Sequence, residues 1–256
     1  MSELETLIDK VHCMDALEMM AQLPDGSVDA IITDLPYGTT ACAWDEIIPF
    51  EAMWAGVKRV LKPRGVFVTT ASQPFTSKLV MSNLAWFRCE WIARKPAGTG
   101  YLNANRQPMK NHENVIVFAP NGHTYNPQMR VGTPYRATRG AVGGFVRDKS
   151  VGGYLTINDG ERFPLTVLDY TWETGLHPTQ KPVDLYEYLI RTYTQPGDVV
   201  LDFCCGSGTT AVAAATLNRR FIVGDTDEGY CAIARKRLET VTPDMFETFG
   251  GFEAKS

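Results

Sequence analysis

Two short runs of residues could do chemistry on an amine carried by a planar ring. Asp34-Leu35-Pro36-Tyr37 follows the apolar run 30–32, and a glycine-containing turn spans 205–210. The aspartate can accept a hydrogen bond from the amine, the Leu35 carbonyl can accept a second, and Tyr37 can stack on the ring. Such hydrogen bonds favour a pyramidal nitrogen, whose lone pair is then free to attack. A Pro-Tyr pair at a strand end can also serve only as core, so the tetrapeptide alone is weak evidence.

The glycine turn has the context of a nucleotide-cofactor loop. Residues 199–204 read as a strand, 205–208 as a turn and 209–217 as a helix. Glycine lets a ligand approach the backbone closely, and a helix N-terminus offers free N–H groups to a carboxylate or phosphate. The next strand ends in Asp225, which is placed either to bind ribose hydroxyls or to cap the following helix. The dinucleotide pattern G-x-G-x-x-G is not met convincingly, which favours S-adenosylmethionine over NAD.

A third run, His177-Pro178-Thr179-Gln180-Lys181-Pro182, precedes a predicted helix. Its side chains could donate hydrogen bonds to a carboxylate at the start of that helix. Alternatively, the run is only a helix cap flanked by prolines.

Together the three runs, at 34–38, 177–182 and 201–210, resemble the amino-group DNA methyltransferases, which act on adenine N6 or cytosine N4. Their order is similar to that of the β class, with the catalytic tetrapeptide first and the cofactor loop last. The resemblance extends from about residue 11 to 238, excluding an insertion. Further matching stretches are 15–17, 59–65 and 111–118.

The resemblance implies roles for individual residues. Asp34, Leu35, Pro36 and Tyr37 would be catalytic. The residues expected to bind S-adenosylmethionine are Asp15, Thr179, Gln180, Lys181, Asp202, Cys204, Gly206, Ser207, Gly208, Thr209 and Asp225. Among them, residues 206–209 would wrap the methionine end of the cofactor, and Thr179 and Lys181 would bind its carboxylate. Asp225 would bind the ribose, and Asp15 would contact the adenine. The sequence departs from the family pattern at Leu35, where the family has proline, and at Phe203-Cys204, where it has Pro-Phe.

The implied function is a sequence-specific DNA methyltransferase that flips its target base and stacks it on Tyr37. Asp34 favours adenine N6, because within the family aspartate at this position is typical of enzymes that methylate adenine N6, whereas serine is typical of those that methylate cytosine N4. Cytosine-N4 methylation is therefore the first alternative. An inactive, cofactor-dependent DNA-binding regulator is a second alternative, motivated by Phe203-Cys204. An RNA or protein-amide methyltransferase is a third.

Apolar strands alternate with amphipathic helices, which predicts an α/β fold with a Rossmann-like, mostly parallel sheet covered by helices on both faces, in permuted order. Expected helices are 16–23, 50–61, 74–85, 182–193, 209–217 and 228–241. Expected strands are 28–33, 66–70, 89–93, 115–119, 199–204 and 221–224. The chain divides into a catalytic half, 1–119, an insertion, 120–172, and a cofactor-binding half, 173–256.

The insertion, 120–172, is rich in glycine and arginine and has no sustained helical period, so we expect an irregular recognition region. Residues 88–149 carry ten Lys or Arg against three acids, a local net charge of +7, which leaves about −11 for the rest. This asymmetry favours one phosphate-binding face, with a solvated basic loop as the alternative. The expected DNA-binding residues are Arg130, Arg136, Arg139, Arg147 and Lys149. A second segment, 39–48, is expected to be a mobile loop that closes over the flipped base.

Composition narrows the class of protein. The chain has 256 residues, 44% hydrophobic and 21% charged, and a net charge of −4. No apolar run approaches a membrane span, so we expect no membrane partner. Six cysteines without a CxxC pair predict reduced thiols and no metal site. We expect a cytoplasmic protein of a bacterium, or of a phage in a bacterial host, acting on double-stranded DNA. A second copy of the chain and a cognate restriction endonuclease are candidate protein partners.

Overall fold

The computed structural model describes residues 3–40, 45–139, 154–170 and 180–241. The chain forms two compact units, one made of 1–126 with 166–256 and the other of 127–165. In the described part of the larger unit, eight strands form one sheet in the order β1-β12-β11-β2-β3-β5-β4-β10. These strands are β1 (Lys10–Cys13), β2 (Val28–Asp34), β3 (Leu61–Ala71), β4 (Phe87–Thr99), β5 (Lys110–Phe118), β10 (Val167–Asp169), β11 (Val199–Asp202) and β12 (Arg220–Asp225).

The sheet is parallel except for β5, which runs antiparallel to both β3 and β4. Its centre joins the two halves of the sequence, because β11 pairs with β2 through Val200 opposite Ala30 and Leu201 opposite Ile31. The C-terminal ends of β2 and β11 therefore lie side by side. This confirms the expected Rossmann-like, mostly parallel sheet.

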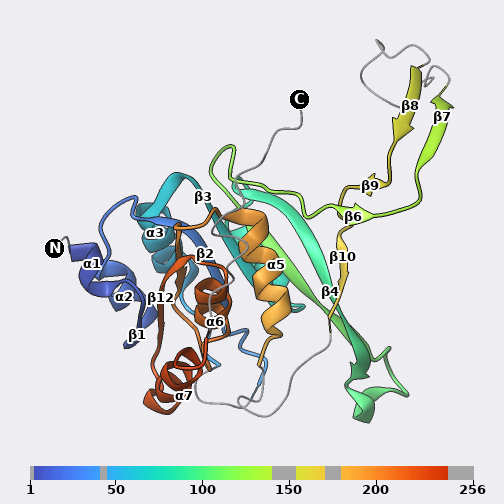
Figure 1. Ribbon diagram of the computed structural model, residues 1–256. Helices are drawn as coiled ribbons and strands as arrows, with labels where there is room; N and C mark the ends of the chain where they lie inside the picture. Colours follow the sequence, from blue (N-terminus) through green and yellow to red (C-terminus); the bar gives the residue numbers. More distant parts are fainter. Residues whose placement is uncertain (1–2, 41–44, 140–153, 171–179, 242–256) are drawn as a thin grey trace. The chain divides into compact units, whose positions relative to one another are not determined.

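Helices cover both faces of the sheet (Figure 1). One face packs against α5 (Val183–Tyr193), α6 (Thr209–Thr216) and α7 (Glu228–Leu238), through a core that includes Leu189, Ala213 and Cys231. The other packs against α2 (Ala16–Gln22), α3 (Phe50–Val60) and α4 (Phe75–Ser82), with α1 (Glu3–Leu7) before them. Two apolar cores, one on each face, hold the sheet rigid, and burial of this kind is the main force that stabilises such a fold.

Helix α3 shows how the sequence pattern becomes packing. Its apolar residues recur at helical spacing, and Met53, Trp54, Val57 and Val60 are all buried. Trp54 meets Phe67 and Phe118 edge-on, with ring centroids 5.2 and 5.0 Å apart. This is a favourable arrangement of aromatic rings.

The segment after α3 differs from expectation. The proline-glycine cluster 62–65 predicts a break before a strand at 66, whereas β3 begins at Leu61. Leu61 pairs with Val28 across a register shift in the ladder, and the Lys62 ammonium lies 2.7 Å from an Asp29 carboxylate oxygen. Proline is tolerated here because a β-bulge interrupts the ladder.

The borders of the expected insertion also shift inward, from 120–172 to 127–165. At its start, Asn126 donates its backbone N–H to the Thr192 carbonyl at 2.7 Å and so belongs to the larger unit. At its end, residues 167–169 pair with Ile92, Ala93 and Arg94 as β10.

The smaller unit has more regular structure than the expected irregular region. Within its described residues, β6 (Arg130–Val131) pairs with β9 (Glu161–Arg162), and β7 (Tyr135–Arg139) pairs with β8 (Tyr154–Asn158), both antiparallel. The Arg162 guanidinium lies 4.6 Å from the centroid of the Tyr135 ring, a cation–π contact.

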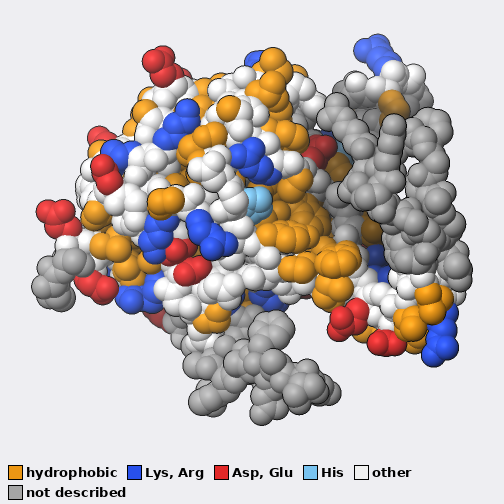
Figure 2. Space-filling model, turned by 90° about the horizontal axis from the view of Figure 1, so that it is seen from above, with side chains coloured by type: hydrophobic (Ala, Val, Ile, Leu, Met, Phe, Trp, Pro, Cys, Tyr) orange, Lys and Arg blue, Asp and Glu red, His pale blue; other side chains and the backbone are white. Residues whose placement is uncertain are grey.

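The surface carries both signs of charge. One face, drawn in Figure 2, gathers hydrophobic side chains near its middle, with Lys, Arg, Asp and Glu interspersed around them. No helix in the described residues is long and apolar enough to cross a membrane.

Candidate active site and cofactor pocket

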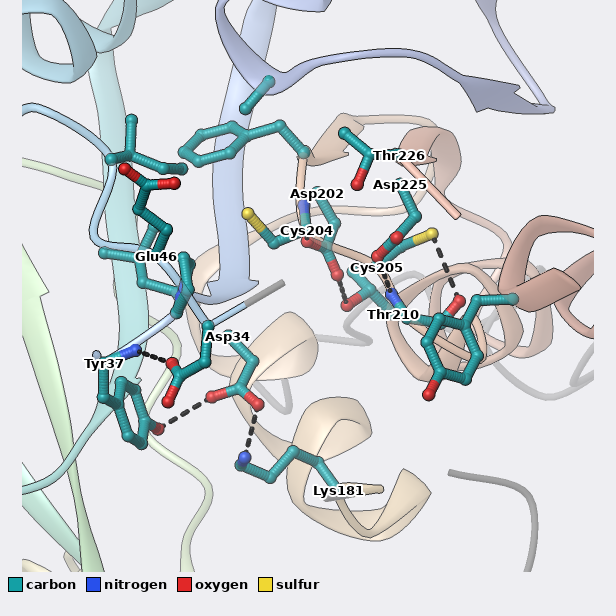
Figure 3. Close-up of a pocket in the computed structure, with 18 of the residues that line it drawn as sticks. Asp34, Tyr37, Glu46, Lys181, Asp202, Cys204, Cys205, Thr210, Asp225 and Thr226 are labelled. Carbon is teal, nitrogen blue, oxygen red and sulfur yellow. Dashed lines mark hydrogen bonds and ion pairs between the residues drawn. The ribbon is translucent and has the colours of Figure 1, made fainter. Parts of the chain in front are cut away.

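A cavity of about 460 Å³ opens where three neighbouring parallel strands end. Strand β2 ends at Asp34, β11 at Asp202 and β12 at Asp225, and all three carboxylates line the cavity (Figure 3). Ligands of α/β proteins bind beyond the carboxyl ends of the strands. The pairing of β11 with β2 thus brings the tetrapeptide and the glycine turn, which are about 170 residues apart, into one site.

Both oxygens of Asp34 accept hydrogen bonds from side chains. The Tyr37 hydroxyl donates to Oδ1 at 2.7 Å, and the Thr70 hydroxyl donates to the same oxygen. Oδ2 pairs with the Lys181 ammonium (Figure 3). A carboxylate has about four lone-pair positions, so this network still leaves Asp34 able to accept another N–H.

Lys181 is 5% exposed and lies between two carboxylates. Its Nζ pairs with Asp34 and lies 3.5 Å from Glu113 Oε2, while Glu113 Oε1 is 2.7 Å from Lys95 Nζ. Burial lowers the pKa of Lys181, but the two carboxylates outweigh it and raise that pKa above its usual value. The resemblance assigned Lys181 to the cofactor carboxylate. In the structure Lys181 lines the cavity and is bound to Asp34, because a buried ammonium needs anionic partners.

The other tetrapeptide residues frame Asp34. Leu35 is buried in the core, and the Tyr37 ring stacks on Phe75 with centroids 5.2 Å apart and planes 29° apart. Burial and the neighbouring Asp34 raise the pKa of the Tyr37 hydroxyl well above its usual value, so it remains a proton donor to Asp34. Pro36 and Tyr37 both line the cavity.

The segment expected to be a mobile loop, 39–48, is described at 39–40 and 45–48 only. Asp45, at the start of its second part, is 8% exposed and hydrogen-bonded to four backbone N–H groups of residues 37–40. At these positions the segment is therefore anchored to the end of the tetrapeptide.

At the glycine-turn end of the cavity, Asp202 is held by uncharged donors. Thr33 Oγ1 donates to Oδ1 at 2.7 Å, Thr210 Oγ1 to Oδ2 at 2.5 Å, and the Cys204 N–H to Oδ1 at 3.0 Å. Burial raises the pKa of Asp202 to about 7, against the lowering effect of these hydrogen bonds. Asp202 thus ties β2, β11 and α6 together at the floor of the cavity.

Asp225 organises the glycine turn. Its Oδ2 accepts the Gly206 N–H at 2.9 Å, and its Oδ1 accepts the Asp227 N–H at 3.0 Å. The helix-cap alternative for Asp225 is wrong, because Asp227 caps α7 by accepting from Gly229 and Tyr230. Asp15 is exposed, lines the cavity and caps α2 through the Leu17 and Glu18 N–H groups.

The residues expected to wrap the cofactor divide between two roles. Gly206, Ser207 and Thr209 line the cavity, with Gln180, Cys204 and Phe203. Gly208 faces α7 instead, where a Cβ would lie 2.5 Å from the Ala234 Cβ, and its φ of +81° starts helix α6. Thr179 lies outside the described residues.

The expected DNA-binding residues are only partly described. Arg130 and Arg136 are exposed on the smaller unit. Arg139 is described in backbone alone, and Arg147 and Lys149 lie outside the described residues. Part of the basic excess at 88–149 is used within the larger unit, since Arg94 binds Asp169 at 2.5 Å and Lys95 binds Glu113.

The polar residues that were not predicted from the sequence include three around the tetrapeptide. Thr70 and Glu113 approach Asp34 and Lys181 from β3 and β5, and Asp45 approaches from the loop. Glu113 lies in the Asn-His-Glu-Asn stretch that matches the family, and Asp45 in Trp44-Asp45, so each sat in a noted segment. Thr70 gave no signal, because a threonine in an apolar strand is ordinary.

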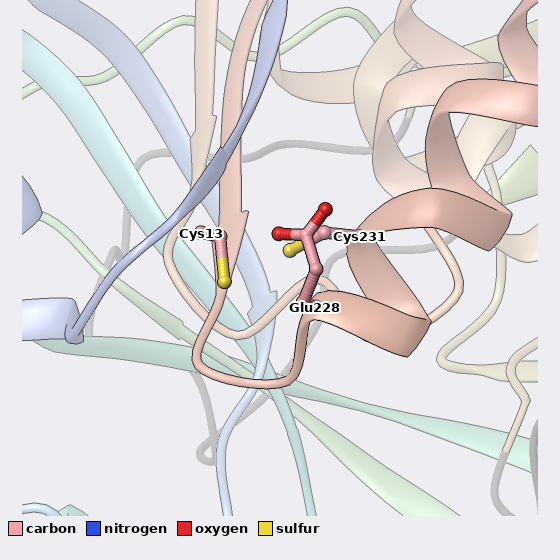
Figure 4. A group of neighbouring side chains, drawn as sticks. All are labelled: Cys13, Glu228 and Cys231. Carbon is pink, nitrogen blue, oxygen red and sulfur yellow. The ribbon is translucent and has the colours of Figure 1, made fainter.

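Beside the cavity, Cys13, Glu228 and Cys231 bring their ligand atoms within 4.8 Å of one another (Figure 4). A side-chain hydrogen bond with Glu228 raises the pKa of the Cys13 thiol, and burial raises that of Cys231 to about 12. Glu228 is bound by Arg235 at 2.5 Å. Glu228 is thus already engaged by Arg235, and both thiols have pKa values above the usual one.

Comparison with known proteins shows the family to which the chain belongs. Residues 28–236 match the family model of N6/N4 DNA methylases. The chain belongs to this DNA methylase family. The methylase is 30% identical over 260 residues to the type II methyltransferase M.HpaI of Haemophilus parainfluenzae, covering 96% of this chain and 76% of that protein. The family uses S-adenosylmethionine as its methyl donor.

Two solved structures share the fold of the methylase. The M1.HpyAVI complex with SAM has a TM-score of 0.60 and 24% identity, over 90% of this chain and 98% of the other. The cytosine-N4-specific PvuII methyltransferase has a TM-score of 0.65 and 16% identity, over 93% and 88%. Their likeness confirms the α/β methyltransferase fold.

Proposed function

We propose that the protein transfers a methyl group from S-adenosylmethionine to the exocyclic N6 of adenine in a specific DNA sequence, with the target base flipped into the cavity. The observation that carries the proposal is the placement of Asp34. Its carboxylate closes β2 inside a cavity whose other wall is the glycine turn, and it keeps lone pairs for an incoming amine.

The cavity fits S-adenosylmethionine. Its volume, about 460 Å³, lies within the range of ordinary cofactor pockets. The carboxylates of Asp15, Asp34 and Asp225 are among the acidic groups that line it, and they suit the positive charge of a sulfonium and an amine. The N-terminus of α6 offers free N–H groups to a carboxylate, and Asp225 offers an acceptor to ribose hydroxyls. Ala16, Leu17 and Phe203 give apolar surface for a ring.

The residues of the chain would act mainly by positioning and electrostatics. The bound cofactor supplies a methyl group activated by its sulfonium. Asp34 accepts one N–H of the target amine and the Leu35 carbonyl accepts the other, which directs the nitrogen lone pair. Tyr37 stacks on the base, and Asp34 is placed to take up the proton that the amine releases. Lys181 and Thr70 hold the Asp34 carboxylate in orientation.

Adenine is proposed over cytosine because the tetrapeptide starts with aspartate. The smaller unit is the proposed reader of sequence, since it exposes Arg130 and Arg136 and such side chains bind guanines or phosphates.

The test is product analysis. The protein is expressed in bacteria that lack DNA methylation, and their DNA is digested to nucleosides and analysed by mass spectrometry. We expect N6-methyladenine in the DNA of cells that express the wild-type protein and none in the DNA of cells that express Asp34→Ala. N4-methylcytosine alone would reject the proposed base. Binding of labelled cofactor without transfer to any DNA would indicate the inactive regulator. Sequencing the same DNA for modified bases identifies the recognition sequence.

A further inference from the structure

Asp45 makes an unusual set of hydrogen bonds beside the catalytic tetrapeptide. Its Oδ1 accepts the N–H groups of Tyr37 at 2.7 Å and Gly38 at 2.8 Å. Its Oδ2 accepts those of Thr39 at 2.8 Å and Thr40 at 2.6 Å. Four successive backbone N–H groups thus converge on one carboxylate, an arrangement that forms an anion-binding nest.

The hydrogen bonds from the N–H groups of residues 37–40 to Asp45 are called the clamp here. Asp45 is 8% exposed, so its charge is compensated by these donors and not by bulk water. Burial alone would raise the pKa of Asp45, but the hydrogen bonds from Thr40, Gly38 and Thr39 outweigh it and lower that pKa. The chain also folds back tightly at this point, since a Cβ on Gly38, whose φ is +66°, would lie 3.0 Å from Ile47 Cγ1.

The clamp acts on the residues that would meet the target base. Tyr37 contributes its N–H to the clamp and its hydroxyl to Asp34, and its ring stacks on Phe75. Fixing the Tyr37 backbone therefore fixes the ring and one donor to the catalytic carboxylate. Asp34 and the glycine turn have other supports, from Thr70, Lys181 and Asp225.

We propose that Asp45 is a positioning residue for methyl transfer, which holds residues 37–40 so that the Tyr37 ring and Asp34 are preorganised for the base. The inference rests on the proposed function of the same cavity. The proposal predicts different effects at the two ends of the cavity. Loss of Asp45 should disturb the base-binding end and leave the cofactor end intact.

The experiment compares Asp45→Ala and Asp45→Asn with the wild type. Asp198→Asn is the matched control, since its Oδ2 accepts the Gln195 N–H at 2.8 Å at the far end of β11 from the cavity. Small misplacements of reacting groups cost about 100-fold in rate. We therefore expect kcat to fall by about this factor in Asp45→Ala, by about tenfold in Asp45→Asn, and to be unchanged in Asp198→Asn. The dissociation constant for S-adenosylmethionine should stay within about twofold of wild type.

A small carboxylate gives a sharper readout. In Asp45→Ala the four N–H groups lose their acceptor while the backbone stays, so formate should occupy the nest and restore kcat in a saturable way, whereas chloride should not. A merely structural role would not give this anion-specific rescue. Equal loss of kcat and of cofactor affinity, or a full-activity Asp45→Ala, would overturn the proposal. So would a reduced kcat that formate leaves unchanged.

Hydrogen exchange separates this inference from the proposed function. In Asp45→Ala the amides of 37–40 should exchange at least about tenfold faster, while those of 199–202 keep wild-type rates. Unchanged exchange at 37–40 would disprove the clamp even if the wild type methylates DNA. A wild type that transfers no methyl group would overturn the proposed function, and with it the catalytic role of Asp45.

Discussion

The two ends of the cavity hold their carboxylates by different means. At the catalytic end, Asp34 is bound by the Lys181 ammonium and by two hydroxyl groups. At the cofactor end, the described partners of Asp202 are two threonine hydroxyls and a backbone N–H, and burial raises its pKa to about 7. Both aspartates close neighbouring parallel strands.

The difference indicates separate tasks for two similar residues. A lysine beside Asp34 offsets its charge and keeps the carboxylate oriented, which suits the proposed role of accepting an N–H of the target amine. Asp202 binds both flanking segments instead, through Thr33 and Thr210, and so fixes the distance between the tetrapeptide and the glycine turn. Replacing each aspartate or its partners should therefore have different consequences.

The largest effect is expected for Asp34→Ala. Removing the acceptor for the amine should lower the rate of methyl transfer about 1000-fold, the range found when one preorganised electrostatic partner is lost. Binding of S-adenosylmethionine, measured by calorimetry, should change little, because the cofactor end keeps its own contacts. Asp25→Ala, at an exposed surface ion pair, serves as control. Loss of binding in parallel with activity would show that Asp34 is structural and would remove the contrast between the two ends.

Lys181→Met should cost stability as well as activity. It leaves the partly buried Asp34 and the buried Glu113 without their shared cation. Breaking a buried pair in this way typically costs about 3 kcal/mol. Urea denaturation of Lys181→Met and of the double variant Lys181→Met/Asp34→Asn tests this, because Glu113 keeps Lys95 whereas Asp34 loses its cation, so the second change should recover part of the loss. Simply additive losses would mean that the ion pairs contribute little.

Much of this arrangement could be predicted from the sequence. Strand–turn–helix signals placed Asp34 and Asp225 at strand ends, and parallel strands bring such ends to one edge, whereas β11 ends at Asp202, two residues earlier than expected. The tetrapeptide and the glycine turn met as expected. The roles of Lys181 and Gly208 could not be predicted, since the partner of a buried charge and the neighbour of a glycine are set by tertiary packing.

Two features, the hydrogen bonds around Asp45 and the strands of the smaller unit, could not be predicted from the sequence. The nest around Asp45 depends on four backbone N–H groups, which every residue except proline carries, so no residue type marks it. The short ladders of the smaller unit could not be predicted, because two-residue strands such as β6 and β9 are too short to show any period.

Gly208→Ala tests the packing of the cofactor end. Gly197 provides a matched control, because both glycines have positive φ, +81° and +86°, but a Cβ on Gly197 meets no atom within 4 Å. Gly197→Ala should cost only the backbone strain, about 1 kcal/mol. Gly208→Ala should cost about 1–3 kcal/mol more, because its Cβ would overlap Ala234. Equal thermal stabilities of the two variants would show that α7 moves away easily.

The smallest effect is expected from Asp202→Asn, and its sign depends on pH. The pKa of Asp202 rises from an ordinary 3.8 to about 7 on folding, so the folded protein binds this proton more tightly than the unfolded chain does. The contribution to stability is therefore complete below about pH 3.8 and is lost as the pH rises through about 7. Asparagine keeps an acceptor for Thr33 and the Cys204 N–H but cannot ionise. Asp202→Asn should thus gain at least about 1 kcal/mol relative to wild type between pH 5 and pH 8, measured by urea denaturation at both values. Asp34→Asn removes the anionic partner of the buried Lys181 and should instead lose stability at both values. If both variants gained equally, the two ends of the cavity would not differ in how they hold charge.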